Sequence, residues 1–186
     1  MRSDALNALS KLISSLLSNI GYNFSMATKE MIQEKIGEAL GLEKAAQKAL
    51  EQLDSRGLLE PEHMRKLSKM KVEAGEQEQQ MEELVQELTD SDGFDSSTIE
   101  EKAVETAEKA SKIMETYLGE DPDTQEALEF LCLAEGGEVA HYEVLSSIAK
   151  DVKNKKFGTQ VRAILKEEKG HLSLCTKLAK NNAASA

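Results

Sequence analysis

Residues 161–172 read VRAILKEEKGHL, and this stretch decides the fold because it places ionisable side chains on the apolar face of a helix. Successive residues of an α-helix lie about 100° apart, so side chains three or four positions apart share a face. Glu168 and His171 fall within the apolar arc, whereas Glu167 and Lys169 point elsewhere. The arc is defined by Val161, Ile164, Leu165, Leu172 and Ala179. A carboxylate buried alone costs several kcal/mol, so Glu168 must be neutralised, paired or bound to metal.

The same pair of residues recurs earlier in the chain with the same spacing. Glu138 and His141 stand three residues apart, as Glu168 and His171 do, and both pairs have the form Glu-x-x-His. His141 lies within an apolar stripe, and Glu138 flanks that stripe. The stripe consists of Phe130, Leu133, Ala134, Val144 and Ile148. Two side chains at positions i and i+3 can hold one metal ion between them. Chance often supplies one such motif in an acidic helix, but two copies near apolar faces predict a metal site shared by two helices.

The first half of the chain repeats the spacing of these acidic residues. Glu43 lies inside the apolar arc of its segment and precedes Glu73 by 30 residues, and Glu138 precedes Glu168 by the same 30. Three residues after Glu73 stands Glu76, where His171 follows Glu168. A bundle with two metals has this pseudo-twofold arrangement, so we predict a full two-metal site.

The second helix contributes least clearly to the predicted site. Its apolar arc puts Glu73 on the flank and Glu76 outside, while Gln77 lies closer to the centre. A local distortion near Gly75 would turn Glu76 inward, as helix bulges at functional sites do. Whether Glu76 or Gln77 completes this side of the site therefore stays open.

Composition predicts an all-α protein. Good helix formers fill long segments, and the chain has only two prolines. Turn residues divide it into four long helices and a shorter connecting one after the second. The expected ranges are 29–53, 61–88, 97–118 (the connecting helix), 123–152 and 157–180. This order predicts an antiparallel four-helix bundle of two hairpins, spanning residues 26–182 with a tail at 183–186, whose long crossover carries a short helix.

Residues 1–25 form a separate extension, which we predict to be an amphipathic helix with little charge. Its apolar residues recur at spacings of three and four: Leu6, Leu9, Ile13, Leu16 and Ile20. Docking on a partner, lying on a membrane surface and targeting all fit this pattern. A secretory signal is disfavoured, because a basic start and a cleavage site are missing.

The acidic composition excludes one large class of functions. The net charge of −11 argues against a general nucleic-acid binder, because phosphate contacts need a basic face, so no nucleic-acid partner is expected. Two cysteines without a Cys-x-x-Cys pair disfavour a disulfide scaffold and zinc-ribbon modules, and a cytoplasmic location is the expectation.

Several stretches resemble the ferritin-like superfamily over residues 29–180. They are LEKAAQKAL (42–50), the run 72–84 and GEVAHYEVL (137–145). The sequence is most similar to uncharacterised bacterial stress-associated ferritin-like proteins, with rubrerythrin-type di-iron proteins next. Gln77 stands where many of these relatives carry His. The resemblance implies two iron or manganese ions that react with oxygen or peroxide.

The leading hypothesis is a di-metal carboxylate protein of the ferritin-like type, active in stress protection. The expected ligands are Glu43, Glu73, Glu76, Glu138, His141, Glu168 and His171, with no catalytic residue distinct from them. Carboxylates with one or two imidazoles suit iron or manganese. Two alternatives stay open, a non-catalytic assembly or scaffold protein and a simple iron buffer. Cys175 is interpreted as a packed thiol and Tyr142 as a residue at the helix edge. Association into a homo-oligomer is common among such bundles.

Overall fold

The computed structural model describes residues 27–185, and these residues form α-helices, one short 3₁₀ turn and no strand. The all-α prediction is therefore confirmed for the described part of the chain. The predicted helix at residues 1–25 lies outside the described residues. The five described α-helices are α2 (Lys29–Ser55), α3 (Pro61–Asp92), α4 (Ser96–Leu118), α5 (Thr124–Ile148) and α6 (Lys155–Ser185), with a 3₁₀ turn, η1, at Ala149–Asp151.

The helix ends follow from local capping chemistry. Pro61 opens α3, where a missing backbone N–H costs nothing. Gly57 follows α2 with a φ of 68°, in the left-handed region that glycine adopts without strain. Asp95, and not the expected Ser97, caps α4, because its carboxylate accepts a hydrogen bond from the Ser97 backbone N–H. At the C-terminal end of the chain, α6 continues through residues 183–185, which were expected to be a tail.

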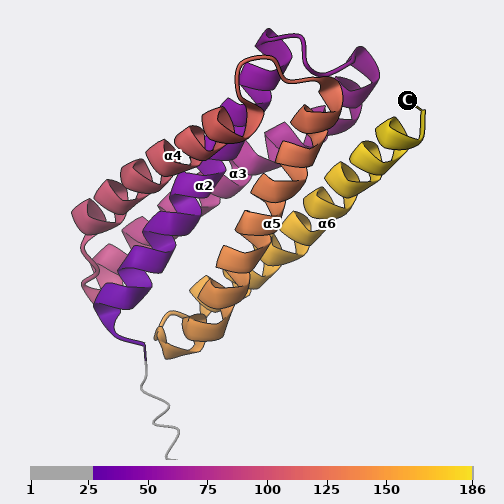
Figure 1. Cartoon of the computed structure of the whole chain (residues 1–186). Helices are drawn as coiled ribbons and strands as arrows, with labels where there is room; N and C mark the ends of the chain where they lie inside the picture. Colours follow the sequence, from indigo (N-terminus) through magenta and orange to yellow (C-terminus); the bar gives the residue numbers. More distant parts are fainter. Residues whose placement is uncertain (1–26, 186) are drawn as a thin grey trace, which may run out of the picture.

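The helices form a bundle in which consecutive long helices run in opposite directions (Figure 1). α2 pairs with α3, α5 pairs with α6, and the two hairpins meet through the contacts of α2 with α5 and of α3 with α6. α4 returns along the outside of α2, so that α5 starts at the end of the bundle where α3 starts (Figure 1). The connecting helix is not short: its 23 residues nearly equal the 25 of α5.

Two glycines bring α4 close to α2. A Cβ atom added at Gly37 would lie 2.6 Å from the Ile99 carbonyl oxygen, and one added at Gly41 would lie 2.4 Å from the Ala103 oxygen. Real Cβ atoms do not approach oxygens so closely, so any larger residue would push the two helices apart. The two glycines therefore allow α4 to pack closely along α2 as a fifth helix.

The apolar core is divided into two clusters with a polar layer between them. On α2, the first cluster includes Ile32 to Leu40, and the second begins at Ala49. Glu43 lies between them and is fully buried. Both clusters bury apolar surface, which stabilises the bundle. They lie on either side of the polar layer and enclose it.

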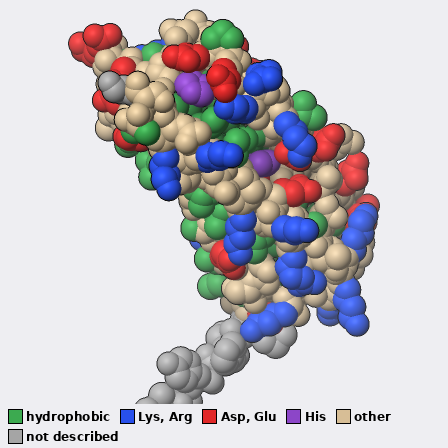
Figure 2. Space-filling view, turned by 90° about the vertical axis from the view of Figure 1, so that its right-hand side faces the viewer, with side chains coloured by type: hydrophobic (Ala, Val, Ile, Leu, Met, Phe, Trp, Pro, Cys, Tyr) green, Lys and Arg blue, Asp and Glu red, His purple; other side chains and the backbone are tan. Residues whose placement is uncertain are grey.

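Charged side chains cover much of the outer surface. On the face lined by α6, basic and acidic side chains are interspersed among apolar ones (Figure 2). Within residues 27–185, no helix has the length and apolar character needed to cross a bilayer.

Candidate metal centre

Five ionisable side chains from three helices meet in the polar layer. They are all buried, with exposed fractions between 0 and 6 %. α2 contributes Glu43, α5 contributes Glu135 and Glu138, and α6 contributes Glu168 and His171. We call this set the carboxylate–His cluster. It concentrates four carboxylates in a region from which water is largely excluded.

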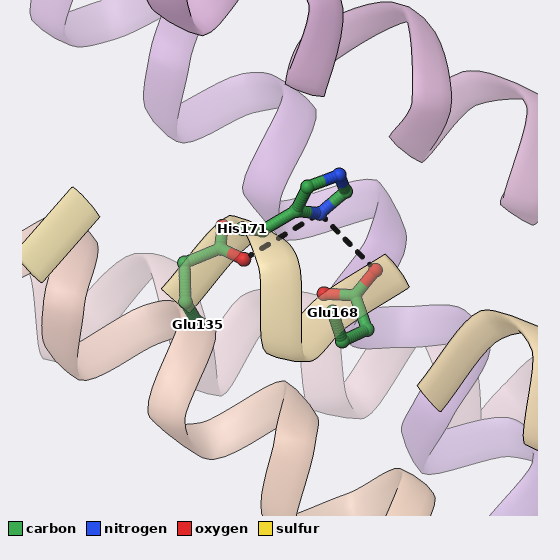
Figure 3. Close-up of side chains that lie close together, drawn as sticks. All are labelled: Glu135, Glu168 and His171. Atoms are coloured by element: carbon green, nitrogen blue, oxygen red, sulfur yellow. Dashed lines mark ion pairs between the residues drawn. The ribbon is translucent and has the colours of Figure 1, made fainter. Parts of the chain in front are cut away.

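The carboxylate–His cluster consists of two groups that share one residue. Glu135, Glu168 and His171 form the first group, and Glu43, Glu138 and Glu168 form the second. In each group, one atom per residue can be chosen so that all chosen atoms lie within 4.8 Å of one another. In the first group, His171 Nδ1 lies 3.3 Å from Glu168 Oε1 and 3.7 Å from Glu135 Oε2, so both carboxylates face the ring (Figure 3). Glu168 therefore stands between two three-residue sites.

Four of the cluster's eight carboxylate oxygens lack a hydrogen-bond donor among the described residues. Glu43 Oε2, Glu135 Oε2 and both oxygens of Glu168 are buried without one. Unpartnered buried polar atoms are rare, because each loses its hydration without compensation. Four such atoms pointing into one layer are the kind of donor set that a cation satisfies.

One cluster oxygen does have a protein partner. The Tyr142 hydroxyl donates a hydrogen bond of 2.6 Å to Glu43 Oε1. Tyr142 is fully buried and belongs to the same helix as Glu138. Burial, followed by the neighbouring Glu43, raises the pKa of its phenol well above the usual value. The hydroxyl therefore keeps its proton and can hold Glu43 in one orientation.

Burial and mutual repulsion raise the pKa of three of the carboxyl groups in the metal-free protein. Burial, with repulsion from Glu168, raises the pKa of Glu43 well above its usual range. Burial, with Glu135 and Glu43 as neighbours, does the same for Glu138. For Glu135, burial and the nearby Glu168 raise the pKa to about 8. Like charges at such distances cannot all ionise together.

Glu168 and His171 behave as the charged pair of the cluster. Burial opposes the charged form of His171, but the close contact with Glu168, with further attraction from Glu135, raises its pKa to about 9. Burial also opposes ionisation of Glu168, yet the neighbouring His171 and Glu138 bring its pKa below the usual value. In the metal-free site, charge is therefore favoured on Glu168 and His171 and disfavoured on the other three carboxyl groups.

The outer nitrogen of His171 contacts a carboxylate on the neighbouring hairpin. His171 Nε2 lies 3.2 Å from Glu73 Oε2, and Glu73 is bound in turn by Lys69. Glu73 therefore lies on the far side of the ring from Glu135 and Glu168. A carboxylate in that position fixes which nitrogen carries the proton and leaves Nδ1 directed at the cluster.

A polar cleft between α3 and α6 reaches this side of the site. Its volume is about 310 Å³. Glu73 and His171 line it together with the basic side chains of Lys66, Lys69 and Lys166. Small charged species therefore have a route to the His171 side of the carboxylate–His cluster.

The structure brings together four of the seven residues expected from the sequence. Glu43, Glu138, Glu168 and His171 lie in the cluster, and Glu73 contacts it through His171. Glu76 is exposed, because α3 stays regular through Gly75 and no bulge turns the side chain inward.

His141, the seventh expected residue, lies away from the cluster. Its Nδ1 is 2.8 Å from the Gly137 carbonyl oxygen and its Nε2 is 3.6 Å from Glu38. The expectation that Glu138 and His141 face one metal together is therefore not met by the geometry. His141 belongs to the half-exposed side of α5.

Gln77 takes the place on α3 where a ligand was expected. Its side chain is fully buried, Nε2 donates to Glu167 Oε2 at 3.1 Å, and Oε1 has no partner among the described residues. It also lies close enough to Glu168 to help lower the pKa of that carboxyl. The first hairpin therefore presents one carboxylate and one amide to the site.

Two members of the site were missed from the sequence, Glu135 and Tyr142. Tyr142 is fully buried, against its interpretation as a residue at the helix edge. The buried stripe of α5 alternates spacings of three and four residues and runs through Leu128, Leu131, Glu135, Glu138, Tyr142 and Leu145. Leu133 and Val144, which suggested a different arc, are about half exposed. This regular spacing indicates the buried face of α5. It is hard to recognise in the sequence because three of the residues on that face are polar.

Comparisons of the chain with protein-family models, with curated proteins and with solved structures found no match. The structure itself supports an all-helical bundle with buried Glu and His clusters that could hold metal.

Proposed function

We propose that the carboxylate–His cluster holds two divalent cations and that Glu168 bridges them. Glu135, Glu168 and His171 would hold one ion, and Glu43, Glu138 and Glu168 the other. The observation that carries the proposal is the set of buried carboxylate oxygens with no donor. Four ionised carboxylates also balance the charge of two divalent ions, which offsets the repulsion that otherwise disfavours their ionisation.

Iron or manganese suits this donor set best. Carboxylate oxygens dominate both groups, and a single imidazole nitrogen joins the first. Copper and structural zinc favour more nitrogen or sulfur ligands. Cys175 is fully buried and contacts the Met70 sulfur at 3.8 Å, and burial, then Glu135, raises the pKa of its thiol, so it packs as a neutral side chain.

We infer that the reaction class is oxidation–reduction with oxygen or peroxide, as in the ferritin-like proteins that the sequence resembles. When bound, iron or manganese ions would supply this chemistry by changing valence. The protein's own residues hold the site in shape: Tyr142 keeps a proton at Glu43 Oε1, and Glu73 orients the His171 ring. Apolar clusters on both sides exclude water from the pair.

Anaerobic metal titration of the full-length protein tests this function. We expect two Fe(II) or Mn(II) ions per chain, followed by consumption of oxygen or peroxide by the iron-loaded protein. Absence of bound metal would favour the scaffold alternative. Tight metal binding without any consumption would favour an iron buffer. The His141→Ala variant serves as a control for the preparation, since His141 lies outside the cluster.

Glu73→Gln is expected to weaken the ion held by His171 by about 10–100-fold, which is the usual effect of losing an outer carboxylate partner. The amide can still approach Nε2, but it no longer attracts the ring proton as strongly. Competition between the protein and a chelating dye for Mn(II) measures the change. Glu76→Gln is the matched control on the same helix, because Glu76 is exposed. Equal affinities in the two variants would contradict the role of Glu73.

A further inference from the structure

A second cleft reaches the carboxylate–His cluster from another side of the bundle. It lies between α2, α4 and α5 and has a volume of about 240 Å³. Its walls are mainly small or apolar residues, among them Ala45, Ala46, Ala49, Ala110, Ile113, Met114, Phe130, Leu133 and Ala134. The chemistry of this cleft is thus opposite to that of the polar cleft beside His171.

The path of α4 along α2 explains why the cleft exists. The two helices touch most closely at Gly37 and Gly41. Beyond these glycines the facing residues are alanines, such as Ala46 on α2 and Ala110 on α4, whose methyl groups leave the space between the helices unfilled. A well-packed core would fill such a space with larger side chains.

The inner end of the cleft belongs to the site. Glu138 lines the cleft and is also a member of the Glu43–Glu138–Glu168 group. The side chain is only 3 % exposed, so a molecule in the cleft would approach the cluster on its Glu138 side. Water would be scarce there, because the surrounding walls are apolar.

Two basic residues line the cleft, Lys48 and His141, and the ring of His141 lies 3.6 Å from the Glu38 carboxylate. Lys48 is exposed and lines the cleft. Within residues 27–185 it forms neither an ion pair nor a side-chain hydrogen bond, whereas Lys44 on the preceding turn pairs with Glu78 and Glu82. An unpaired ammonium at the edge of an apolar cleft is complementary to an amphipathic anion.

We propose that the α2–α4–α5 cleft binds a small organic monocarboxylate, with its hydrocarbon part along the alanine-lined wall toward Glu138 and its carboxylate at Lys48. The volume fits such a molecule, since an apolar cavity of about 150 Å³ holds benzene. The inference rests on the proposed function in one respect: the bound hydrocarbon would be the molecule presented to the metal pair. It specifies a substrate class that the metal ligands alone do not indicate.

Calorimetric titration of the full-length, Mn(II)-loaded protein with octanoate tests the cleft, with octan-1-ol as the neutral probe of equal chain length. Ala110→Leu fills the cleft and should weaken octanoate binding about tenfold, as overpacking does. Ala140→Leu is the matched control: it is exposed on α5 and lines neither this cleft nor the adjoining one that shares Lys48. Its affinity should stay within about twofold of the parent. Lys48→Met should weaken octanoate binding about fivefold and leave octan-1-ol unchanged.

Several outcomes would overturn the inference. Equal octanoate affinity of the Ala110→Leu and Ala140→Leu variants would do so. Failure of octanoate to bind a protein that holds two metal ions would also do so. A parent dimer that octanoate dissociates in sedimentation velocity runs would assign the cleft to a second copy of the chain. Ala134→Leu on α5 provides a second filling variant should Ala110→Leu fail to fold.

Metal content of the same samples separates this inference from the proposed function. Octanoate binding with the expected variant pattern in a protein that holds no metal would support the cleft and contradict the metal pair. Two bound ions without octanoate binding would support the metal pair and contradict the cleft.

Discussion

Glu168→Gln is expected to reduce metal content from two ions per chain to none. Glu168 is the one residue common to both three-residue groups, so the change removes a charged ligand from each. An amide of the same shape cannot supply the negative charge that two adjacent cations require. Glu43→Gln and His171→Ala each alter one group only, so we expect those variants to keep one ion. Equilibrium dialysis followed by elemental analysis counts the ions.

The controls for this experiment come from residues that the sequence pattern suggested and the geometry places elsewhere. Glu76→Gln changes an exposed carboxylate on α3, and His141→Ala changes a ring bonded to Gly137 and near Glu38. Both variants should keep two ions. A Glu168→Gln protein that still binds two ions would contradict the bridging role. Loss of metal from the Glu76→Gln protein would contradict the proposed ligand set.

The order and type of the helices could be predicted from sequence because each helix carries its own signals. Periodic apolar residues, the proline at the start of α3 and the left-handed Gly57 act over a few residues. The packing of α4 could not be predicted in the same way. It depends on Gly37 and Gly41 meeting backbone oxygens of a helix some 60 residues further along the chain. Their Gly-x-x-x-Gly spacing is compatible with close approach of a helix, but it does not say which helix approaches.

The site was predictable where a charged residue interrupts an otherwise clear apolar stripe. Glu43 and Glu168 are of this kind, and His171 follows Glu168 at the helical spacing. On α5 the stripe contains two glutamates and a tyrosine, so an arc drawn through apolar residues rotated toward Leu133 and His141. Because the predicted arc was rotated by about one residue, it included His141 and left out Glu135 and Tyr142. A buried stripe that is itself polar cannot be located by hydrophobicity alone.

Glu135→Gln is expected to stabilise the metal-free protein and to destabilise the metal-loaded one. In the metal-free protein Glu135 is 2 % exposed, and its pKa is about 8. The unfolded chain loses this proton near pH 4.3. Between these values the native state holds more protons than the unfolded state, so the free energy of unfolding falls as pH rises. The amide side chain of the variant does not ionise, so its free energy of unfolding does not fall with pH for this reason. At pH 8 we expect the variant to gain about 1–4 kcal/mol, as for other replaced buried charges.

The pH and the metal distinguish this explanation from a simple packing effect. Near pH 5 the Glu135 carboxyl is protonated in the native state, so the variant's advantage should shrink toward zero. At pH 8 the gain corresponds to a rise in Tm of about 2–4 °C per kcal/mol for a chain of this size. Mn(II) at 1,000 times the Kd reverses the order, because the ion at His171 then adds about 4.1 kcal/mol to the parent and the variant loses this ion. Glu129→Gln, an exposed change on the same helix, should move neither Tm. A metal-free Glu135→Gln protein that melts below the metal-free parent at pH 8 would show that Glu135 stabilises the metal-free fold. This result would contradict the explanation that the buried carboxylates lower the stability of the metal-free protein and are present to bind metal.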